Sequence, residues 1–79
     1  MNLTQFGKFT RKLRIDRGEL LKDMAEKLNC KPSFLSNVEI GRREVPAAWR
    51  SIILVKYKLS YNEFLELSNA INGEDEING

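Results

Sequence analysis

Few residues in this sequence are of the types that perform covalent chemistry. Histidine is absent and Cys30 is the only cysteine, so an intramolecular disulfide and a Cys/His zinc site are both excluded. Cys30 stands within an apolar pattern, which favours a small buried hydrophobic residue over a reactive thiol. The sequence has no phosphate-binding glycine-rich loop, nucleophile elbow or convergent pair of carboxylates. We therefore expect no catalysis, no metal and no cofactor, and a function in binding.

The side chains best placed to bind a partner lie near the middle of the chain. Leu35 and Val38 are spaced i and i+3, as residues on the buried side of a helix are. The side chains that this leaves facing other directions are Ser33, Phe34 and Asn37. A helix this short is not stable alone in water, so neighbouring helices must hold it while its outer side chains remain available for recognition.

A second short helix is predicted just before this one. The residues that form one apolar stripe with a 3.6-residue period are Met24, Ala25 and Leu28. Asn29 then interrupts the pattern, and Asn is the non-glycine residue that best tolerates the positive φ expected in a tight turn. Pro32 suits the first position of the next helix, where its missing N–H has no helical partner. Residues 21–40 are thus predicted to form two short helices joined by a tight turn.

Charge is distributed unevenly along the chain. The net charge is only +2, but residues 1–58 hold all 13 Lys and Arg residues against six acidic residues. Residues 59–79 hold five acidic residues and no basic one. Phosphates are attracted to a positive surface and repelled by an acidic one, so nucleic acid is expected on the first part of the chain. The ordinary alternative for such a mildly basic domain is a solvated charged surface.

Length and composition limit the organisation of the protein. Its 79 residues suffice for one domain, without a separate ligand-sensing or catalytic domain. The N-terminus has no uninterrupted apolar run, so we expect neither a signal peptide nor a membrane span, and a cytoplasmic location. The acidic segment over residues 73–79 is expected to be a disordered tail.

Residues 21–40 resemble the helix-turn-helix of the Cro/repressor (lambda repressor-like, XRE) family. The resemblance is carried by small Ala25, by the turn at Asn29, and by the runs from Pro32 to Ser36 and from Glu39 to Arg43. It extends over about residues 4–70, through Phe6, Gly7, Phe9, Leu13, Arg14 and Gly18 upstream, and Pro46 and residues 60–65 downstream. It implies an all-α, five-helix DNA-binding domain over residues 1–72, with the helix-turn-helix at the second and third helices.

The resemblance also implies roles for individual residues. In this family the N-terminal part of the third helix enters the major groove of DNA. The implied base-reading residues are Ser33, Asn37, Phe34 and Lys31, and the implied phosphate contacts are Arg42, Arg43, Lys22 and Ser36. Asn37 is suited to a bidentate pair with adenine, whereas Phe34 contacts a thymine methyl or sugar or instead packs on the domain surface. Arg14 is expected to pair with Glu39 and so to fix the angle of the third helix.

The sequence departs from the family at the start of the second and third helices. The family has a hydroxyl cap followed by a glutamine that contacts phosphate, where this chain has Leu20 and Leu21. Lys31 likewise replaces a capping Ser or Thr, although its ammonium group can reach guanine or phosphate. An exposed pair of leucines beside the reading helix would suit a protein partner.

The remaining helices are predicted from their caps and apolar spacing. Asn2 or Thr4 caps a helix that runs to about Arg17, where Gly18 ends it. The fourth helix is expected over residues 46–58, with Trp49, Ile52, Ile53, and either Val55 or the stem of Lys56 turned toward the core. Ser60 and Glu63 form a capping box for a fifth helix that reaches about Ile71. Its apolar set either closes the core or forms a dimer surface of Tyr61, Phe64, Leu67 and Ile71.

Together these features predict a sequence-specific transcriptional regulator that binds double-stranded DNA. The expected protein is a homodimeric repressor of the phage or mobile-element type, which acts by covering its operator. The alternative is an antitoxin-like or adaptor protein on the same fold, whose leucines and fifth helix hold a protein partner. A protein partner is expected in that case, and DNA binding would be secondary.

Overall fold

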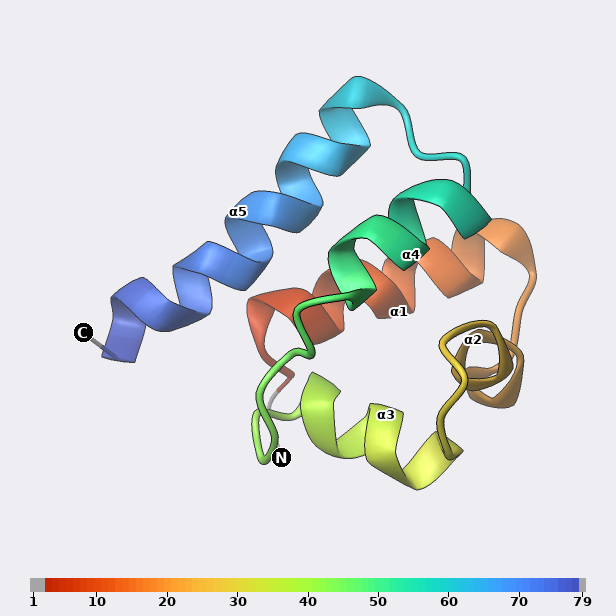
Figure 1. The fold of residues 1–79 in the computed structure, drawn as a ribbon, viewed down its shortest axis with the longest axis horizontal. Helices are drawn as coiled ribbons and strands as arrows, with labels where there is room; N and C mark the ends of the chain where they lie inside the picture. Colours follow the sequence, from red (N-terminus) through yellow and green to blue (C-terminus); the bar gives the residue numbers. More distant parts are fainter. Residues whose placement is uncertain (1–2, 79) are drawn as a thin grey trace.

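The computed structural model describes residues 3–78, and the side chains of residues 3–73, as five α-helices (Figure 1). The helices are α1 (Gln5–Arg17), α2 (Leu21–Lys27), α3 (Pro32–Glu39), α4 (Trp49–Lys56) and α5 (Tyr61–Asn78). Residues 3–78 contain no strand, so the predicted all-α class is confirmed. No helix in this part of the chain is long and apolar enough to cross a membrane.

Helix α1 lies at the centre of the arrangement, with α3 and α5 packed on opposite sides of it (Figure 1). Thr10 and Arg14 of α1 bond to a residue of α3. Lys8 and Lys12, from the other side of α1, line a shallow groove together with residues of α5. The outer face of α3 therefore points away from the acidic fifth helix.

One hydrophobic core joins the five helices. Its fully buried members come from every helix, and the largest are Phe6, Met24, Leu35, Ile53 and Leu67. Trp49 of α4 is 4% exposed, and its ring centroid lies 6.2 Å from that of Phe6 of α1. Because α2 and α3 have fewer than ten residues each, this shared burial rather than helix propensity holds them in place.

Local hydrogen bonds explain where the helices begin. The Thr4 hydroxyl accepts from the Gly7 N–H at 3.0 Å, which confirms Thr4 as the cap of α1. Ser60 and Glu63 form the predicted capping box, because each backbone N–H donates to the other side chain. At α2, Leu20 has no capping side chain, but the Asp23 carboxylate accepts from its N–H at 2.8 Å.

The first four helices end in the same way. Each is followed by a residue with positive φ, and these residues are Gly18, Asn29, Gly41 and Lys58. In every case this residue and the next one donate their N–H groups back to carbonyls of the last turn, as in a Schellman motif. The positive φ predicted for Asn29 is confirmed at 56°. Lys58 reaches 50° without being Gly or Asn, which the sequence did not reveal.

Helix α4 is shorter than predicted. The expected start at Pro46 is wrong, because the Pro46 carbonyl accepts from the Trp49 N–H in a turn and the helix begins only at Trp49. The helix also ends at Lys56, two residues before the expected Lys58. Val55 is 69% exposed, so it does not face the core.

Helix α5 is longer than predicted. It continues to Asn78, whereas an end near Ile71 and disorder over residues 73–79 were expected; Gly79 lies outside the described residues. Gly73 does not interrupt the helix. A Cβ at this position would lie 2.7 Å from the side-chain oxygen of Gln5, which can move aside, so α5 passes close to the start of α1 without requiring glycine here.

The positive φ of Lys58 predicts a stabilising substitution. Replacing Lys58 by Gly removes the steric cost of the left-handed conformation and should stabilise the fold by about 0.5 to 1 kcal/mol, after the entropy that glycine adds to the unfolded chain. For a domain of this size, the midpoint of thermal unfolding followed by circular dichroism should rise by about 4 °C. The control is Lys56→Gly, at the last residue of α4, which should lower stability by about 0.5 kcal/mol. Equal losses in both variants would contradict this account.

Candidate functional site

One side of α3 is buried in the core, and the opposite side carries polar side chains. Leu35 and Val38 are 0% and 1% exposed, whereas Lys31 and Ser33 are exposed and Asn37 is half-buried. Ser33 and Asn37 are four residues apart and so lie on the same face, one turn from each other. The structure therefore brings these two predicted base-reading residues onto one accessible stripe.

The loop after α3 is tied to the last turn of that helix. The Gly41 N–H donates to the Val38 carbonyl at 3.1 Å, and the Arg42 N–H donates to the Asn37 carbonyl at 2.9 Å. These bonds hold the backbone that carries Arg42 and Arg43, whose side chains are both exposed. The predicted phosphate-binding arginines thus follow directly from the end of the candidate reading helix.

Phe34 packs on its own domain. Its ring is half-buried and meets the Trp49 ring edge-on, with the centroids 5.8 Å apart and the planes at 83°. The Arg43 guanidinium lies 5.9 Å from the centroid of the Phe34 ring. This geometry favours the packing alternative for Phe34 over direct contact with a base.

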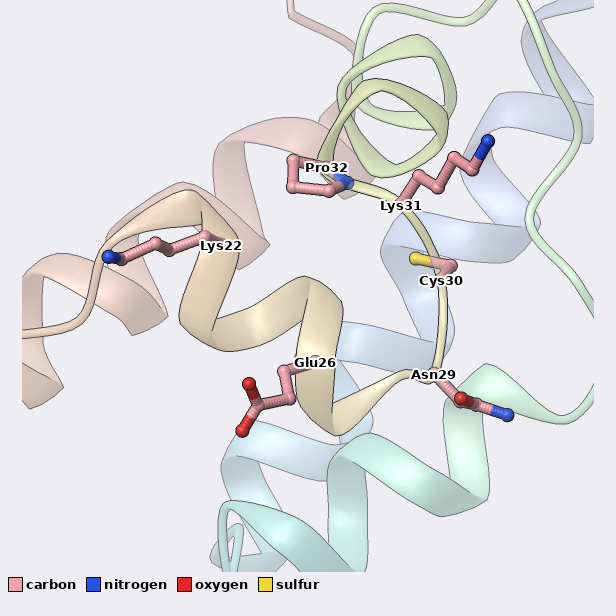
Figure 2. A pocket seen from close by; sticks show the side chains of 6 residues that line it. All are labelled: Lys22, Glu26, Asn29, Cys30, Lys31 and Pro32. Atoms are coloured by element: carbon pink, nitrogen blue, oxygen red, sulfur yellow. The ribbon is translucent and has the colours of Figure 1, made fainter.

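A shallow hollow lies beside the turn between α2 and α3 (Figure 2). It is lined by Lys22, Glu26, Asn29, Cys30, Lys31 and Pro32. Figure 2 shows the amino groups of Lys22 and Lys31 directed away from each other, toward opposite sides of the hollow. Ser36, the remaining predicted phosphate contact, is half-buried on α3 rather than fully exposed. Lys22 and Lys31 therefore lie at the hollow near the start of α3, whereas Arg42 and Arg43 follow its end.

Cys30 is half-buried at this hollow and packs against the core. Burial raises the pKa of its thiol, so the reactive thiolate is disfavoured at neutral pH. Among the described side chains, those of residues 3–73, no group of Cys, Asp and Glu is arranged to hold a metal ion.

A buried ion pair fixes α3 against α1. Arg14 and Glu39 form two hydrogen bonds, Nη1 with Oε2 and Nη2 with Oε1, the latter at 3.3 Å. Thr10 donates to Glu39 Oε2 at 2.7 Å, and Arg14 Nη1 lies 3.4 Å from the Met24 sulfur. Because Arg14 is 8% and Glu39 4% exposed, these contacts replace water around both charges. The pair that the sequence predicted is present, and it links α1, α2 and α3.

The sequence did not identify Thr10 as a partner of Glu39. A signal was available, because Thr10 and Arg14 are four residues apart and share one face of the first helix. Thr4 also contributes, since its N–H and its hydroxyl both donate to the Glu39 carbonyl, at 3.0 and 2.9 Å. The end of α3 is therefore held by both its backbone and its side chain.

The residues suggested as a dimer surface do not all lie on the surface. Leu67 is fully buried and Ile71 packs against the core, because their side of α5 closes the domain. Including Leu67 was therefore wrong. Tyr61 is 75% exposed, and Phe64 is half-buried with the Arg50 guanidinium 5.9 Å from its ring centroid. Leu65, at 41% exposed, joins Tyr61 as the apolar surface of this helix.

The buried pair predicts a large loss of stability when one partner is neutralised. Glu39→Gln leaves the Arg14 charge buried without a counter-charge and should destabilise the domain by about 2 to 3 kcal/mol. The matched control is Glu44→Gln, which makes the same change at an exposed position and should have little effect. The free energy of unfolding of both variants is measured from the midpoint of urea unfolding. Similar midpoints for the two would show that the pair does not hold α3.

No family model, curated protein or solved structure matches the chain. Its function is therefore inferred from the arrangement of the side chains around α3.

Proposed function

We propose that this chain is a sequence-specific transcriptional regulator that reads double-stranded DNA with the outer face of α3. In this proposal α2, its turn and α3 form a helix-turn-helix of the Cro/repressor type. One observation carries it. Ser33 and Asn37 lie one turn apart on the accessible side of a helix whose other side is locked into the core. Rigid placement of this kind is what base recognition requires, because hydrogen bonds to base edges are directional.

The proposed reading residues differ in what they can distinguish. The Asn37 amide both donates and accepts, so it can pair with N6 and N7 of adenine in the major groove. The Ser33 hydroxyl is less selective because it can either donate or accept. Lys31, exposed at the start of α3, can donate to guanine O6 or N7. Asn37 is therefore the proposed main determinant of sequence preference.

Basic side chains around α3 are proposed to contact the DNA backbone. Arg42 and Arg43 follow the C-terminal end of α3, and Lys22 is exposed on α2, the helix that precedes it. Contacts of this kind release counterions and set the register of the protein without distinguishing bases. Ser36, half-buried on α3, is proposed to supply a neutral hydroxyl donor.

The proposed regulator acts as a homodimer in the cytoplasm and represses by covering its operator. Tyr61 and Leu65 of α5 support self-association, because they are exposed apolar side chains on one helix. A two-fold dimer places its two reading helices about 34 Å apart, one turn of DNA. The expected operator is then an inverted repeat.

A second candidate function is a protein-interaction module of the antitoxin or adaptor type. Leu20 favours this function, because its apolar side chain is 62% exposed at the start of α2. An apolar side chain here suits a protein surface better than a phosphate backbone. Its neighbour Leu21 supports this reading less, because it packs partly against the core.

Selection of bound duplexes from a random DNA pool at moderate salt distinguishes the two functions. A recovered inverted repeat, with half-sites about one helical turn apart, is the expected result. Bulk binding that depends on salt but yields no sequence motif would contradict specific recognition and favour the protein-interaction module. Size-exclusion chromatography with light scattering on the same sample tests the proposed dimer.

Substitutions on and beside α3 should separate base reading from backbone contact. Asn37→Ala should relax the preference at one base position by about 1 to 3 kcal/mol, whereas Arg42→Ala should weaken all sequences alike and reduce the salt slope by about one. The control is Lys12→Ala, which removes one positive charge from the side of α1 that lines the groove with α5. The affinity of all three variants for matched and mismatched duplexes is measured by fluorescence anisotropy. Identical effects of Asn37→Ala and Arg42→Ala would refute these roles.

A further inference from the structure

Three side chains form a continuous stack from the core to the surface beside α3. Trp49 is buried at 4% exposure, Phe34 rests edge-on against it, and Arg43 lies over the Phe34 ring. Phe34 belongs to the candidate reading helix, while Arg43 belongs to the loop that follows it. The stack thus connects an exposed guanidinium to the rigid centre of the domain.

We propose that Phe34 is a positioning residue for Arg43, which makes a backbone phosphate contact beside the bases that α3 reads. This inference rests on the proposed DNA-binding function. It assigns Phe34 a role through Arg43 and removes it from the set of residues that touch bases. Arg43 becomes the phosphate contact that is directly coupled to the reading helix.

The coupling follows from the physics of the aromatic ring. The face of a phenyl ring carries negative charge density, which attracts a guanidinium within about 6 Å. The edge-on Trp49 contact limits rotation of the Phe34 ring. An arginine held over that face has lost part of its rotamer freedom before it meets a ligand, so ordering it on binding costs less. Its outward N–H groups remain able to donate to a phosphate.

The position of Phe34 places this contact next to the reading residues. Phe34 precedes Asn37 by three residues on α3, so the two side chains are neighbours on the helix surface. A guanidinium above the Phe34 ring is consequently adjacent to the same stripe. The phosphate that it contacts would flank the base step read by Ser33 and Asn37.

A double-mutant cycle on DNA affinity tests the inference. Phe34→Leu keeps an apolar side chain but removes the ring face, and Arg43→Ala removes the guanidinium. Each should weaken duplex binding by roughly fivefold to tenfold at 0.1 M salt and lower the salt slope by about 0.9, the value for one lost phosphate contact. The double variant should lose no more than Arg43→Ala alone. Phe34→Tyr, which keeps the ring face, should bind within about twofold of wild type.

Lys22 provides the matched control, because it is a proposed phosphate contact on a different helix. The losses of Phe34→Leu and Lys22→Ala should multiply in their double variant, as expected for independent sites. Multiplying losses for Phe34→Leu and Arg43→Ala would overturn the inference. Full loss of affinity in Phe34→Tyr would overturn it as well.

A second measurement does not depend on the folding of Phe34→Leu or on DNA. In the free wild-type protein, a stacked Arg43 should show ring-current shifts of its side-chain protons by NMR. Random-coil shifts for Arg43 would overturn the positioning role. Failure of the wild-type protein to bind any duplex at low salt would instead overturn the proposed function, including the phosphate contact, whatever the Arg43 shifts. The two failures are therefore distinguishable.

Discussion

The buried pair of Arg14 and Glu39 is the contact on which the position of α3 depends. Removing two charges from water is costly, and the cost is offset only when the partners are close and their remaining hydrogen-bonding groups are satisfied. Thr10 supplies one such bond to the Glu39 carboxylate. Gly7 makes the approach possible, because a Cβ there would lie 2.3 Å from the Glu39 carbonyl oxygen. The same residue of α3 is therefore held through its side chain and its backbone, which leaves the outer face rigid.

The helix ends provide a second constraint, which acts locally. Three of the first four helices have only seven or eight residues and are not stable alone, so they must end where the chain can turn back into the core. Gly18, Asn29, Gly41 and Lys58 each adopt positive φ and close the preceding helix with the same pair of backbone bonds. The resulting connections are short. At α3 this closure also determines where Arg42 and Arg43 leave the helix.

Features that depend on a few neighbouring residues were predictable from the sequence. The caps at Thr4 and Ser60 and the turns at Gly18, Asn29 and Gly41 each follow from the chemistry of one short segment. Contacts between distant segments were less accessible: the Arg14–Glu39 pair was expected only through a family resemblance, and Thr10 was missed. Leu67 was assigned to a surface because apolar spacing shows which residues share a helix face, not which neighbour covers it. Lys58 was missed because lysine does not signal positive φ in a sequence, although it closes α4 with the same backbone bonds as the other three residues.

The small net charge of +2 is unevenly distributed, because Glu63 and Glu66 of α5 lie near basic residues of α1. Arg17 Nη2 of α1 lies 3.8 Å from Glu63 Oε2, and Glu66 lines a groove with Lys12. These acidic residues of α5 therefore offset basic charge on the side of α1 opposite α3. Near α3 the four basic residues Lys22, Lys31, Arg42 and Arg43 are in excess over the neighbouring acids Asp23, Glu26 and Glu44, since Glu39 is paired with Arg14. This excess is positive but small. Under the proposed DNA-binding function, so small an excess would give limited affinity through counterion release, and binding would depend more on directional contacts from a firmly held helix. The buried Arg14–Glu39 pair and the stacking of Arg43 on Phe34 fit that requirement. Both restrict α3 or Arg43 before binding, so less conformational entropy is lost when DNA binds.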